Sequence, residues 1–210
     1  MLFRSLLGLT IHALVYYPLV AWLVGKKSPK VYLGQGADAI MTAVSCNSSL
    51  ATVPVTLRCL DRMQVSPQSA RLAACVGTNL NNDGITLYEA MAALFLAQAL
   101  GFDLPLGSQL LIVAASMIAG AGVAGIPEAG MIVLPLVLSA AGLPTPVIVA
   151  AIPLILTVDW IIARARSGVN VLSDMLVAIL LDVGRISPVA ESIALQPQSE
   201  VTNPTEPQTF

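Results

Sequence analysis

The sequence contains 210 residues, of which 56% are hydrophobic and 10% are charged, and its mean hydropathy is +0.82. Soluble domains carry about 25% charged residues, so this chain has too few polar side chains to cover a surface in water. A net charge of −2 without a basic stripe excludes a nucleic-acid-binding protein, and the apolar composition excludes a disordered or collagen-like chain. The chain is therefore expected to be an integral membrane protein surrounded by a lipid bilayer.

The first apolar segment, residues 5–25, contains no charged residue. As a helix it would reach about 31 Å, which is enough to cross a hydrocarbon core about 30 Å thick. Tyr16, Tyr17 and Trp22 are expected to anchor this span at the interface, and the lysines at 26–27 place its C-terminal end in the cytoplasm. A signal peptide is the less favoured alternative, because no small-residue cleavage site follows.

Residues 37–57 are predicted to form a re-entrant hairpin, which enters the membrane and returns to the same side. Basic residues flank the segment at both ends, which places both ends in the cytoplasm and excludes a single crossing. Ser48, Ser49 and Pro54 lie within the run, where a lipid-facing helix tolerates them poorly. The tip is therefore expected to be buried in protein or to line a cavity; an amphipathic surface helix is the alternative.

Residues 72–100 are predicted to form a span that is broken in its first half. The polar run Asn81-Asn82-Asp83-Gly84 favours a discontinuous helix with free backbone carbonyls. The loop that follows contains Asp103 and no basic residue, which is typical of an outer face.

Residues 109–182 are predicted to contain a second re-entrant hairpin, which enters from the outside, and then the last span. The glycine, alanine and proline residues of 119–130 would break a helix midway. Four polar side chains of the last span share one helical face: Asp159, Arg166, Asn170 and Asp174.

The predicted fold is an all-α membrane domain over residues 1–186, with about three transmembrane helices and two re-entrant hairpins. Arg185 places the end of the last helix in the cytoplasm. Residues 187–210 are rich in Pro, Gln, Ser, Thr and Glu and are predicted to be a disordered cytoplasmic tail.

Ionisable side chains inside membrane segments are costly and usually face a protein interior or a pathway. Arg164 and Arg166 offer guanidinium groups for carboxylates, and the serines of the first hairpin and the glycines of the second offer hydroxyl and backbone N–H groups. Hard oxygen ligands suited to Na⁺ are offered by Asn81, Asp83, Asn170 and Asp174. Together these groups predict a small anionic substrate that is bound and carried with cations.

Four ordered motifs resemble the dicarboxylate/amino acid:cation symporter family, over about residues 5–182. The run 47–56 resembles the serine-rich tip of its first hairpin, and 81–84 resembles its Asn-Met-Asp-Gly break. The run 124–130 resembles the tip of its second hairpin, and 159–174 resembles its last helix. The resemblance implies the transport core of the glutamate-transporter fold.

The resemblance also implies roles for individual residues. Arg166 matches the arginine that pairs with the distal carboxylate of the substrate. Further substrate contacts are implied at Ser48, Ser49, Gly125, Pro127, Ser167 and Asn170. Cation contacts are implied at Asn81, Asp83, Asn170 and Asp174. Glu89 matches the glutamate proposed as proton carrier in proton-coupled members; the alternative is a buried acid that pairs with Arg164 or Arg166.

The chain departs from the family pattern at several of these positions. Ala163 replaces the aspartate that holds the α-amino group of amino-acid substrates, which favours a substrate without that amine, such as a C4-dicarboxylate. Asn82 and Ile85 replace a methionine and a threonine, so the number of coupled sodium ions is open. Glu128 introduces an acid at the second hairpin tip, where it would take a proton, repel an anion or be solvated.

The leading prediction is a secondary active symporter in the plasma or inner membrane, coupled to Na⁺ and/or H⁺, without other cofactors. The alternative is a truncated, non-transporting or partner-dependent member, because the family's preceding helices, which form its scaffold and trimer contact, have no counterpart in the sequence. A homotrimer is expected only if those helices are supplied. An intramembrane hydrolase using Ser48 or Ser49 is not favoured, because His12 lies on another segment with no triad-like spacing.

Overall fold

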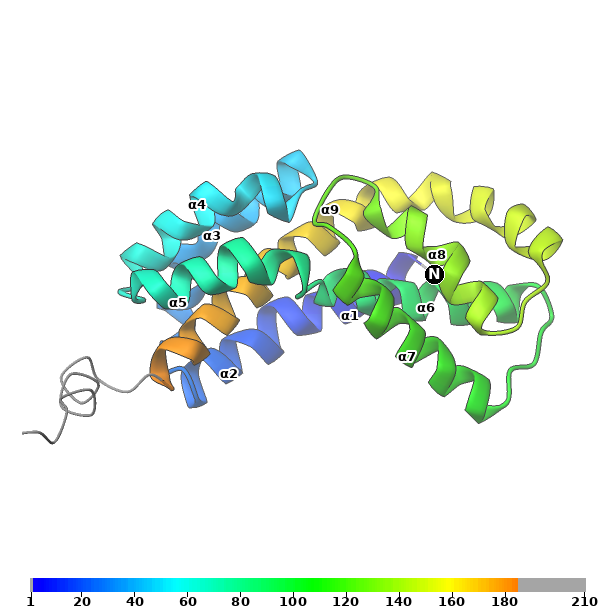
Figure 1. Ribbon diagram of the computed structural model, residues 1–210, viewed down its shortest axis with the longest axis horizontal. Coiled ribbons are helices and arrows are strands. Elements are labelled where there is room, and N and C mark those ends of the chain that lie inside the picture. The colour runs from blue at the N-terminus through cyan, green and yellow to red at the C-terminus, as the bar shows by residue number, and fades with distance from the viewer. Residues whose placement is uncertain (1, 185–210) are drawn as a thin grey trace, which may run out of the picture.

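The computed structural model describes residues 2–184 of the chain, and all regular structure within them is helical (Figure 1). The predicted all-α fold is confirmed for this part of the chain. The predicted tail, residues 187–210, lies outside the described residues.

The first membrane segment is one continuous helix made of α1 (Leu2–Ile11), a π-turn η1 (His12–Tyr16) and α2 (Tyr17–Leu23). By length and apolar composition, the stretch Phe3–Leu23 could cross a membrane. The predicted interfacial role of Tyr17 is wrong, because this side chain is only 1% exposed and packs inside the protein.

The predicted first hairpin is formed by α3 (Pro29–Cys46) and α4 (Ser49–Arg62), which are longer than the predicted 37–57. Ser28 caps α3 by accepting a hydrogen bond from the backbone N–H of Val31, so the helix begins well before the apolar run. The turn falls at residues 47–48, and Pro54 lies inside α4 rather than at the turn.

The predicted broken span begins with α5 (Pro67–Arg71) and continues through the π-turn η2 (Leu72–Val76) and the 3₁₀ turn η3 (Gly77–Asn79). Residues 80–82 are not helical, and α6 (Asp83–Ala99) starts directly after them. The helix is therefore interrupted where the asparagines were expected to interrupt it.

The second hairpin is formed by α7 (Leu106–Gly122) and α8 (Ala129–Ala140), joined by residues 123–128. The last helix, α9 (Thr145–Val183), has 39 residues and is about 58 Å long. It is the second helix long and apolar enough to cross a membrane.

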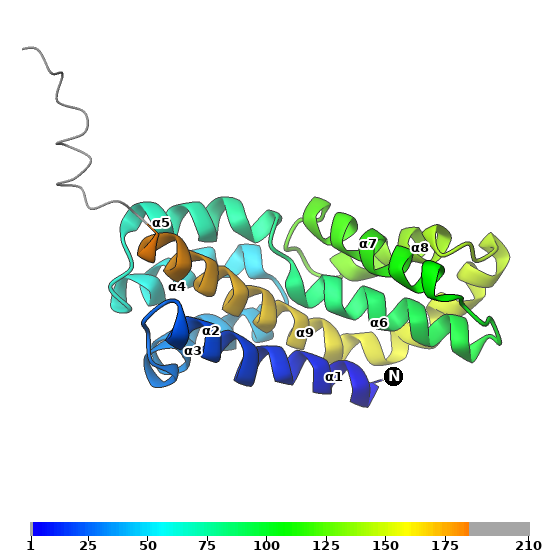
Figure 2. The same ribbon diagram turned by 90° about the horizontal axis from the view of Figure 1, so that it is seen from below.

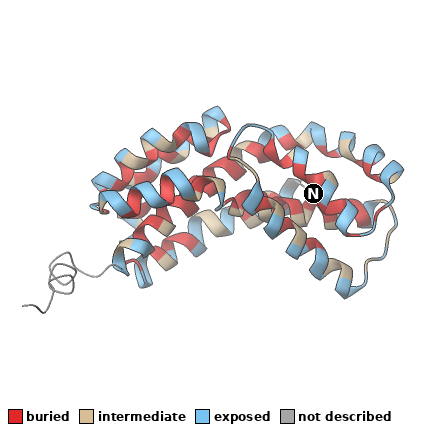
Figure 3. Ribbon diagram, in the orientation of Figure 1, coloured by how far each residue is buried: buried red, intermediate tan, exposed pale blue. Residues whose placement is uncertain are grey.

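Helix α9 runs along the whole molecule and packs against both hairpins and against α1, α2 and α6 (Figures 1 and 2). The tips of the two hairpins meet near the middle of this helix (Figure 1). Buried residues follow the faces between helices, whereas many large apolar side chains of the outer faces are exposed (Figure 3). An exposed apolar surface of this kind suits contact with lipid or with further protein.

Gly84 controls how closely α6 approaches α9. A Cβ atom at this position would lie 2.6 Å from the backbone oxygen of Arg166, and the Gly84 N–H donates a 2.8 Å hydrogen bond to Asn170 Oδ1. We expect Gly84→Ala to lower stability by about 1–3 kcal/mol through this overlap. The melting temperature of the purified chain in detergent measures the effect.

Gly34→Ala is the matched control, because a Cβ there meets nothing within 4 Å on the exposed face of α3. This change should leave the melting temperature equal or higher, since alanine favours a helix over glycine by about 1 kcal/mol. Equal melting temperatures for the two variants would contradict the predicted overlap.

Candidate functional site

The tips of the two hairpins are joined by hydrogen bonds at Gly125. Its carbonyl oxygen accepts from Ser48 Oγ at 2.7 Å and from the Leu50 N–H at 3.2 Å. Ser48 also caps α4, since its Oγ accepts from the Ala51 N–H. The sequence places a serine where one hydroxyl can both start a helix and join it to the opposite tip.

The contact between the tips requires glycine at 125 and leaves one hydroxyl without a partner. A Cβ atom on Gly125 would lie 2.1 Å from Ser49 Oγ. Ser49 is 2% exposed, and its Oγ makes no hydrogen bond. Pro127, also predicted as a substrate contact, is exposed in the loop between α7 and α8. The tips therefore bring together Ser48, Ser49 and Gly125, three of the residues predicted to contact substrate.

The break before α6 is held by two asparagine side chains. Asn82 Nδ2 donates to the carbonyl oxygens of Gly120 and Val123, at 3.0 and 2.8 Å. Asn170 Nδ2 on α9 donates to Asn82 Oδ1 at 3.1 Å. These bonds connect the broken helix to the end of α7 and to α9, so the break lies beside the second hairpin.

A cluster of side-chain oxygens lies on the other side of the break. Asn81 Nδ2 donates to Asp174 Oδ1 at 3.1 Å, and Ser173 Oγ donates to Asp83 Oδ2 at 2.6 Å. Tyr17 OH donates to the same Asp83 oxygen at 3.0 Å. The three predicted cation ligands Asn81, Asp83 and Asp174 thus belong to one network, whereas Asn170 reaches it through Asn82 and Gly84.

This oxygen cluster is suited to a small hard cation of low charge. It contains only two carboxylates, with amide and hydroxyl oxygens beside them, and such ligands favour Na⁺ over soft metals. Over residues 2–184, no three His, Cys, Asp or Glu side chains gather in a way that could hold a metal ion. A site for a transition metal therefore finds no support in the described residues.

A buried guanidinium lies at the centre of the second polar cluster. Arg166 is 3% exposed, and its Nη2 lies 3.3 Å from Asp159 on the same face of α9. Its Nη1 lies 3.8 Å from Glu89 Oε1, which is an ion pair without a hydrogen bond. The guanidinium carbon lies 4.2 Å from the ring centre of Tyr88, a cation–π distance.

Several atoms in this cluster have unused hydrogen-bonding capacity. Arg166 Nη1 and Asp159 Oδ1 make no hydrogen bond, and neither do the two carboxylate oxygens of Glu89. The cluster also depends on Gly130 of α8, where a Cβ atom would lie 1.8 Å from Arg166 Nη1. A buried N–H group without a partner is costly, so Arg166 Nη1 can donate to one further acceptor. The sequence left Arg164 and Arg166 open as ion-pair partners of Glu89, and the structure shows that the partner is Arg166.

The two arginines predicted to contact substrate do not converge. Arg164 stacks over Trp160 at 4.2 Å from the ring centre and donates from Nη1 to the Trp160 carbonyl oxygen at 2.9 Å. Residues two apart on a helix point in different directions, so Arg164 faces away from Arg166. Ser167 does reach the tips, because its Oγ donates to Asn47 Oδ1 at 3.1 Å.

A narrow cavity of about 10 Å³, which is roughly the space for one water molecule, lies between the hairpin tips and α9. Its lining includes Asn47, Glu128, Ala163, Arg166 and Ser167. Glu128 has a left-handed backbone with φ of 60°, and its Oε1 accepts from Asn47 Nδ2 at 3.2 Å. The cavity brings residues of three segments that are distant in the sequence to one place.

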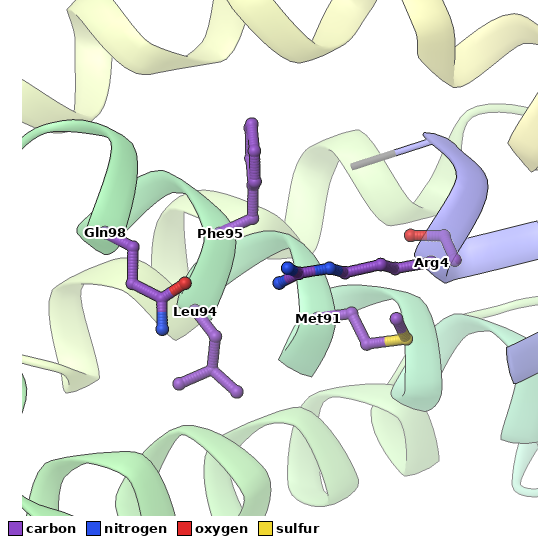
Figure 4. Close-up of a pocket in the computed structure, with 6 residues that line it drawn as sticks. Arg4, Met91, Leu94, Phe95 and Gln98 are labelled. Carbon is purple, nitrogen blue, oxygen red and sulfur yellow. The ribbon is translucent and has the colours of Figure 1, made fainter.

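A larger cavity, of about 160 Å³, opens between α1 and α6 (Figure 4). Arg4 extends across it toward Met91, Phe95 and Gln98 of α6. None of the predicted site residues lines this cavity, so it is separate from the site at the hairpin tips.

Sequence reasoning missed two members of the oxygen cluster, Ser173 and Tyr17. Ser173 directly precedes Asp174, but a single serine carries no signal of its own. Tyr17 lies in a segment that is apolar on all sides, where periodicity does not show which residue faces inward. Asn82 was predicted to help break the helix and was noted as a departure from the family motif, but its contact with the second hairpin was not foreseen; its amide binds two carbonyl oxygens there.

Comparison with known proteins identifies close relatives. The family model described as "Sodium:dicarboxylate symporter family" matches residues 1–183. The chain is 42% identical over 172 residues to excitatory amino acid transporter 1 of Rattus norvegicus, which covers 81% of this chain and 31% of that protein. The human protein of the same name is 41% identical over the same span.

Excitatory amino acid transporter 3 of Mus musculus is 42% identical over 168 residues, or 80% of this chain and 31% of that protein. The chain thus matches about a third of the length of these relatives, which are transporters and not enzymes. With nearly all described residues inside the matched range, the chain belongs to the sodium:dicarboxylate symporter family.

Proposed function

We propose that the chain forms the substrate- and cation-binding core of a secondary active symporter, which carries anionic dicarboxylates or acidic amino acids with Na⁺ and/or H⁺. The observation that carries this proposal is the buried Arg166 guanidinium, whose Nη1 has no hydrogen-bond partner beside the point where the hairpin tips meet. A guanidinium is a specific partner for a carboxylate because its planar N–H groups match the two oxygens. The substrate carboxylate would complete the pairing that Glu89 and Asp159 leave unfinished.

The remaining substrate contacts come from the tips and from α9. Ser49 Oγ is buried without a partner and is free to donate. Ser48, Gly125 and Pro127 would close over the substrate, and Ser167 and Asn170 would meet it from α9. The predicted contact of Arg164 with substrate has less geometric support, since its guanidinium lies over Trp160.

The coupling cation would bind among the oxygens of Asn81, Asp83, Asn170 and Asp174. The proposed ion is Na⁺, with the hydroxyl of Ser173 as an additional neighbour. Movement of one net positive charge inward supplies about 2.3 kcal/mol per 100 mV of membrane potential. Cotransport with more than one cation would therefore drive accumulation of an anion.

Glu89 is the proposed proton carrier. One guanidinium faces two buried carboxylates, Glu89 and Asp159, with the Tyr88 ring packed against it. This cluster carries a net charge of −1 when both acids are ionised, and one proton neutralises it. A proton could thus enter and leave the site with little change in packing.

The proposed location is the plasma or inner membrane, with several crossings and a cytoplasmic C-terminus. The exposed apolar faces support burial in lipid. Homotrimer assembly, like transport itself, is proposed for the complete protein, because the chain matches about a third of its relatives' length. The alternative is a truncated, non-transporting or partner-dependent member of the family.

The decisive experiment is uptake of radiolabelled aspartate and succinate into liposomes that contain the purified chain, with and without an inward Na⁺ gradient. We expect gradient-dependent uptake, and Arg166→Lys should lower it at least tenfold, because the loss of hydrogen bonds to a charged group costs about 1.5–3 kcal/mol. Arg164→Lys, on the outward face of α9, is the matched control and should retain most uptake.

Binding of substrate without uptake would favour the partner-dependent alternative. If chain that is monodisperse in detergent shows no binding and no uptake, the proposed function is refuted.

Removal of one carboxylate from the oxygen cluster should weaken Na⁺ binding. Asp174→Asn keeps the shape of the buried side chain but removes its charge. We expect the Na⁺ concentration for half-maximal thermal stabilisation to rise about tenfold, which corresponds to about 1.4 kcal/mol. Asp38→Asn removes a carboxylate from an exposed ion pair with Arg62 and should leave this concentration unchanged. Equal shifts in both variants would argue against a cation site at Asp174.

The role of Glu89 is tested by the pH dependence of uptake. Glu89→Gln keeps the size of the side chain and removes its proton, so uptake by this variant should no longer change between pH 5 and 8. Asp103→Asn, in the exposed loop before α7, should keep the pH dependence of the unmodified chain. A pH profile that survives in Glu89→Gln would assign the titration to another group.

A further inference from the structure

The cavity at the hairpin tips is lined by two residues of opposite charge. Arg166 approaches it from α9 with an Nη1 that makes no hydrogen bond, and Glu128 approaches it from the loop before α8. Among the residues that line this cavity, Glu128 is the one acid. Glu89 and Asp159 do not line it, since they lie against the guanidinium elsewhere. A ligand that enters here as the hairpin tips separate would therefore meet a positive group at one point and a negative group at another.

The Glu128 carboxylate is held in place by a hydrogen bond from Asn47. Asn47 Nδ2 donates to its Oε1 at 3.2 Å, and Asn47 Oδ1 in turn accepts from Ser167 Oγ at 3.1 Å. These two bonds connect the carboxylate to the first hairpin and to α9. No bond to Oε2 is formed by any residue in the range 2–184, so this oxygen is open to a further donor.

The backbone conformation and hydrogen bonding of Glu128 indicate that its carboxylate does not cap helix α8. Its φ of 60° lies in the left-handed region, which glycine adopts freely and other residues adopt at a cost. Although Glu128 stands at the N-cap of α8, its side chain makes no capping hydrogen bond. A glutamate here is thus held in an unfavourable conformation, and its carboxylate makes no hydrogen bond to the helix N-terminus that would stabilise it.

Ala163 adds no polar group to the α9 side of the cavity, where Arg166 and Ser167 supply the polar side chains. It is 2% exposed and lies one turn from Ser167 on α9. Taken alone, Ala163 predicts a substrate without an amine. The structure shows that a carboxylate nevertheless reaches the same cavity, from the opposite hairpin.

We infer that Glu128 binds the ammonium group of the substrate, and that the site therefore selects an acidic amino acid over a dicarboxylate that lacks an amine. The inference rests on the proposed function, in which Arg166 binds a carboxylate of the same molecule. An ammonium group would donate to Glu128 Oε2, whereas a dicarboxylate would bring its second negative charge toward Glu128. Like charges at this distance disfavour binding, so Glu128 both attracts one substrate class and repels the other.

The test is equilibrium binding of radiolabelled L-aspartate and succinate to the purified full chain in nanodiscs, at saturating Na⁺. Unmodified chain should bind aspartate at least tenfold more tightly than succinate. In Glu128→Gln, which retains an acceptor for Asn47, the Kd for aspartate should rise about tenfold, the size expected for a lost charged hydrogen bond. The Kd for succinate should stay the same or fall.

Two further variants separate the charge from the backbone. Glu128→Gly relieves the left-handed strain, so a loss of aspartate binding in this variant cannot come from misfolding of the turn. Ala163→Asp combined with Glu128→Gln returns a carboxylate to the same cavity from α9 and should restore the preference for aspartate. Melting temperatures show that each variant is folded.

The outcomes distinguish this inference from the proposed function. Aspartate binding that is unchanged in both Glu128→Gln and Glu128→Gly, or tighter binding of succinate to the unmodified chain, overturns the inference and leaves the proposed function standing. If folded, unmodified chain binds neither aspartate nor succinate, both the inference and the proposed function are overturned. Arg166→Lys should weaken both ligands, in contrast to the selective effect of Glu128→Gln.

Discussion

The burial of one guanidinium organises the centre of this protein. A charge in a low-dielectric interior is stable only with compensating partners, and those of Arg166 come from α9 and α6. Asp159 lies two turns earlier on α9, Glu89 and Tyr88 lie on α6, and α8 approaches so closely that a Cβ atom at Gly130 would lie 1.8 Å from Arg166 Nη1. Because the three helices meet around this group, their packing depends on it, and so does the anion binding proposed above.

The break in the membrane span is stabilised by amides in place of helical hydrogen bonds. Asn82 binds two carbonyl oxygens at the end of α7, and Asn170 binds both Asn82 and the first turn of α6. Unpaired backbone groups are costly inside a membrane, so these amides make the interruption possible. The same interruption exposes Asn81 and Asp83 toward Asp174. The oxygen cluster therefore depends on the amide hydrogen bonds that satisfy the backbone groups of the broken helix.

Helix positions and the polar face of α9 were predictable because both follow from local sequence: apolar length, helix-breaking residues and the 3.6-residue period. The same period could have separated Arg164 from Arg166, since residues two apart diverge by about 200° around a helix. The inward orientation of Tyr17 was not predictable, because its segment is apolar on every side. The exact position of the first turn, at 47–48, depends on Asn47 adopting a left-handed backbone and on the contact of Ser48 with Gly125, which only the folded chain reveals.

The contact between the hairpin tips is weak, so little free energy is needed to separate them. It consists of two hydrogen bonds to Gly125 and one between Asn47 and Glu128, with glycine and serine where larger side chains would overlap. At about 0.5–1.5 kcal/mol each, these bonds sum to a few kcal/mol, similar to the energy of moving one or two charges through 100 mV. The α7–α8 loop could therefore separate from the first hairpin while the Arg166 cluster, buried between α6, α8 and α9, stays closed. Substrate affinity and gate stability would then be linked through Glu128, which contributes to both.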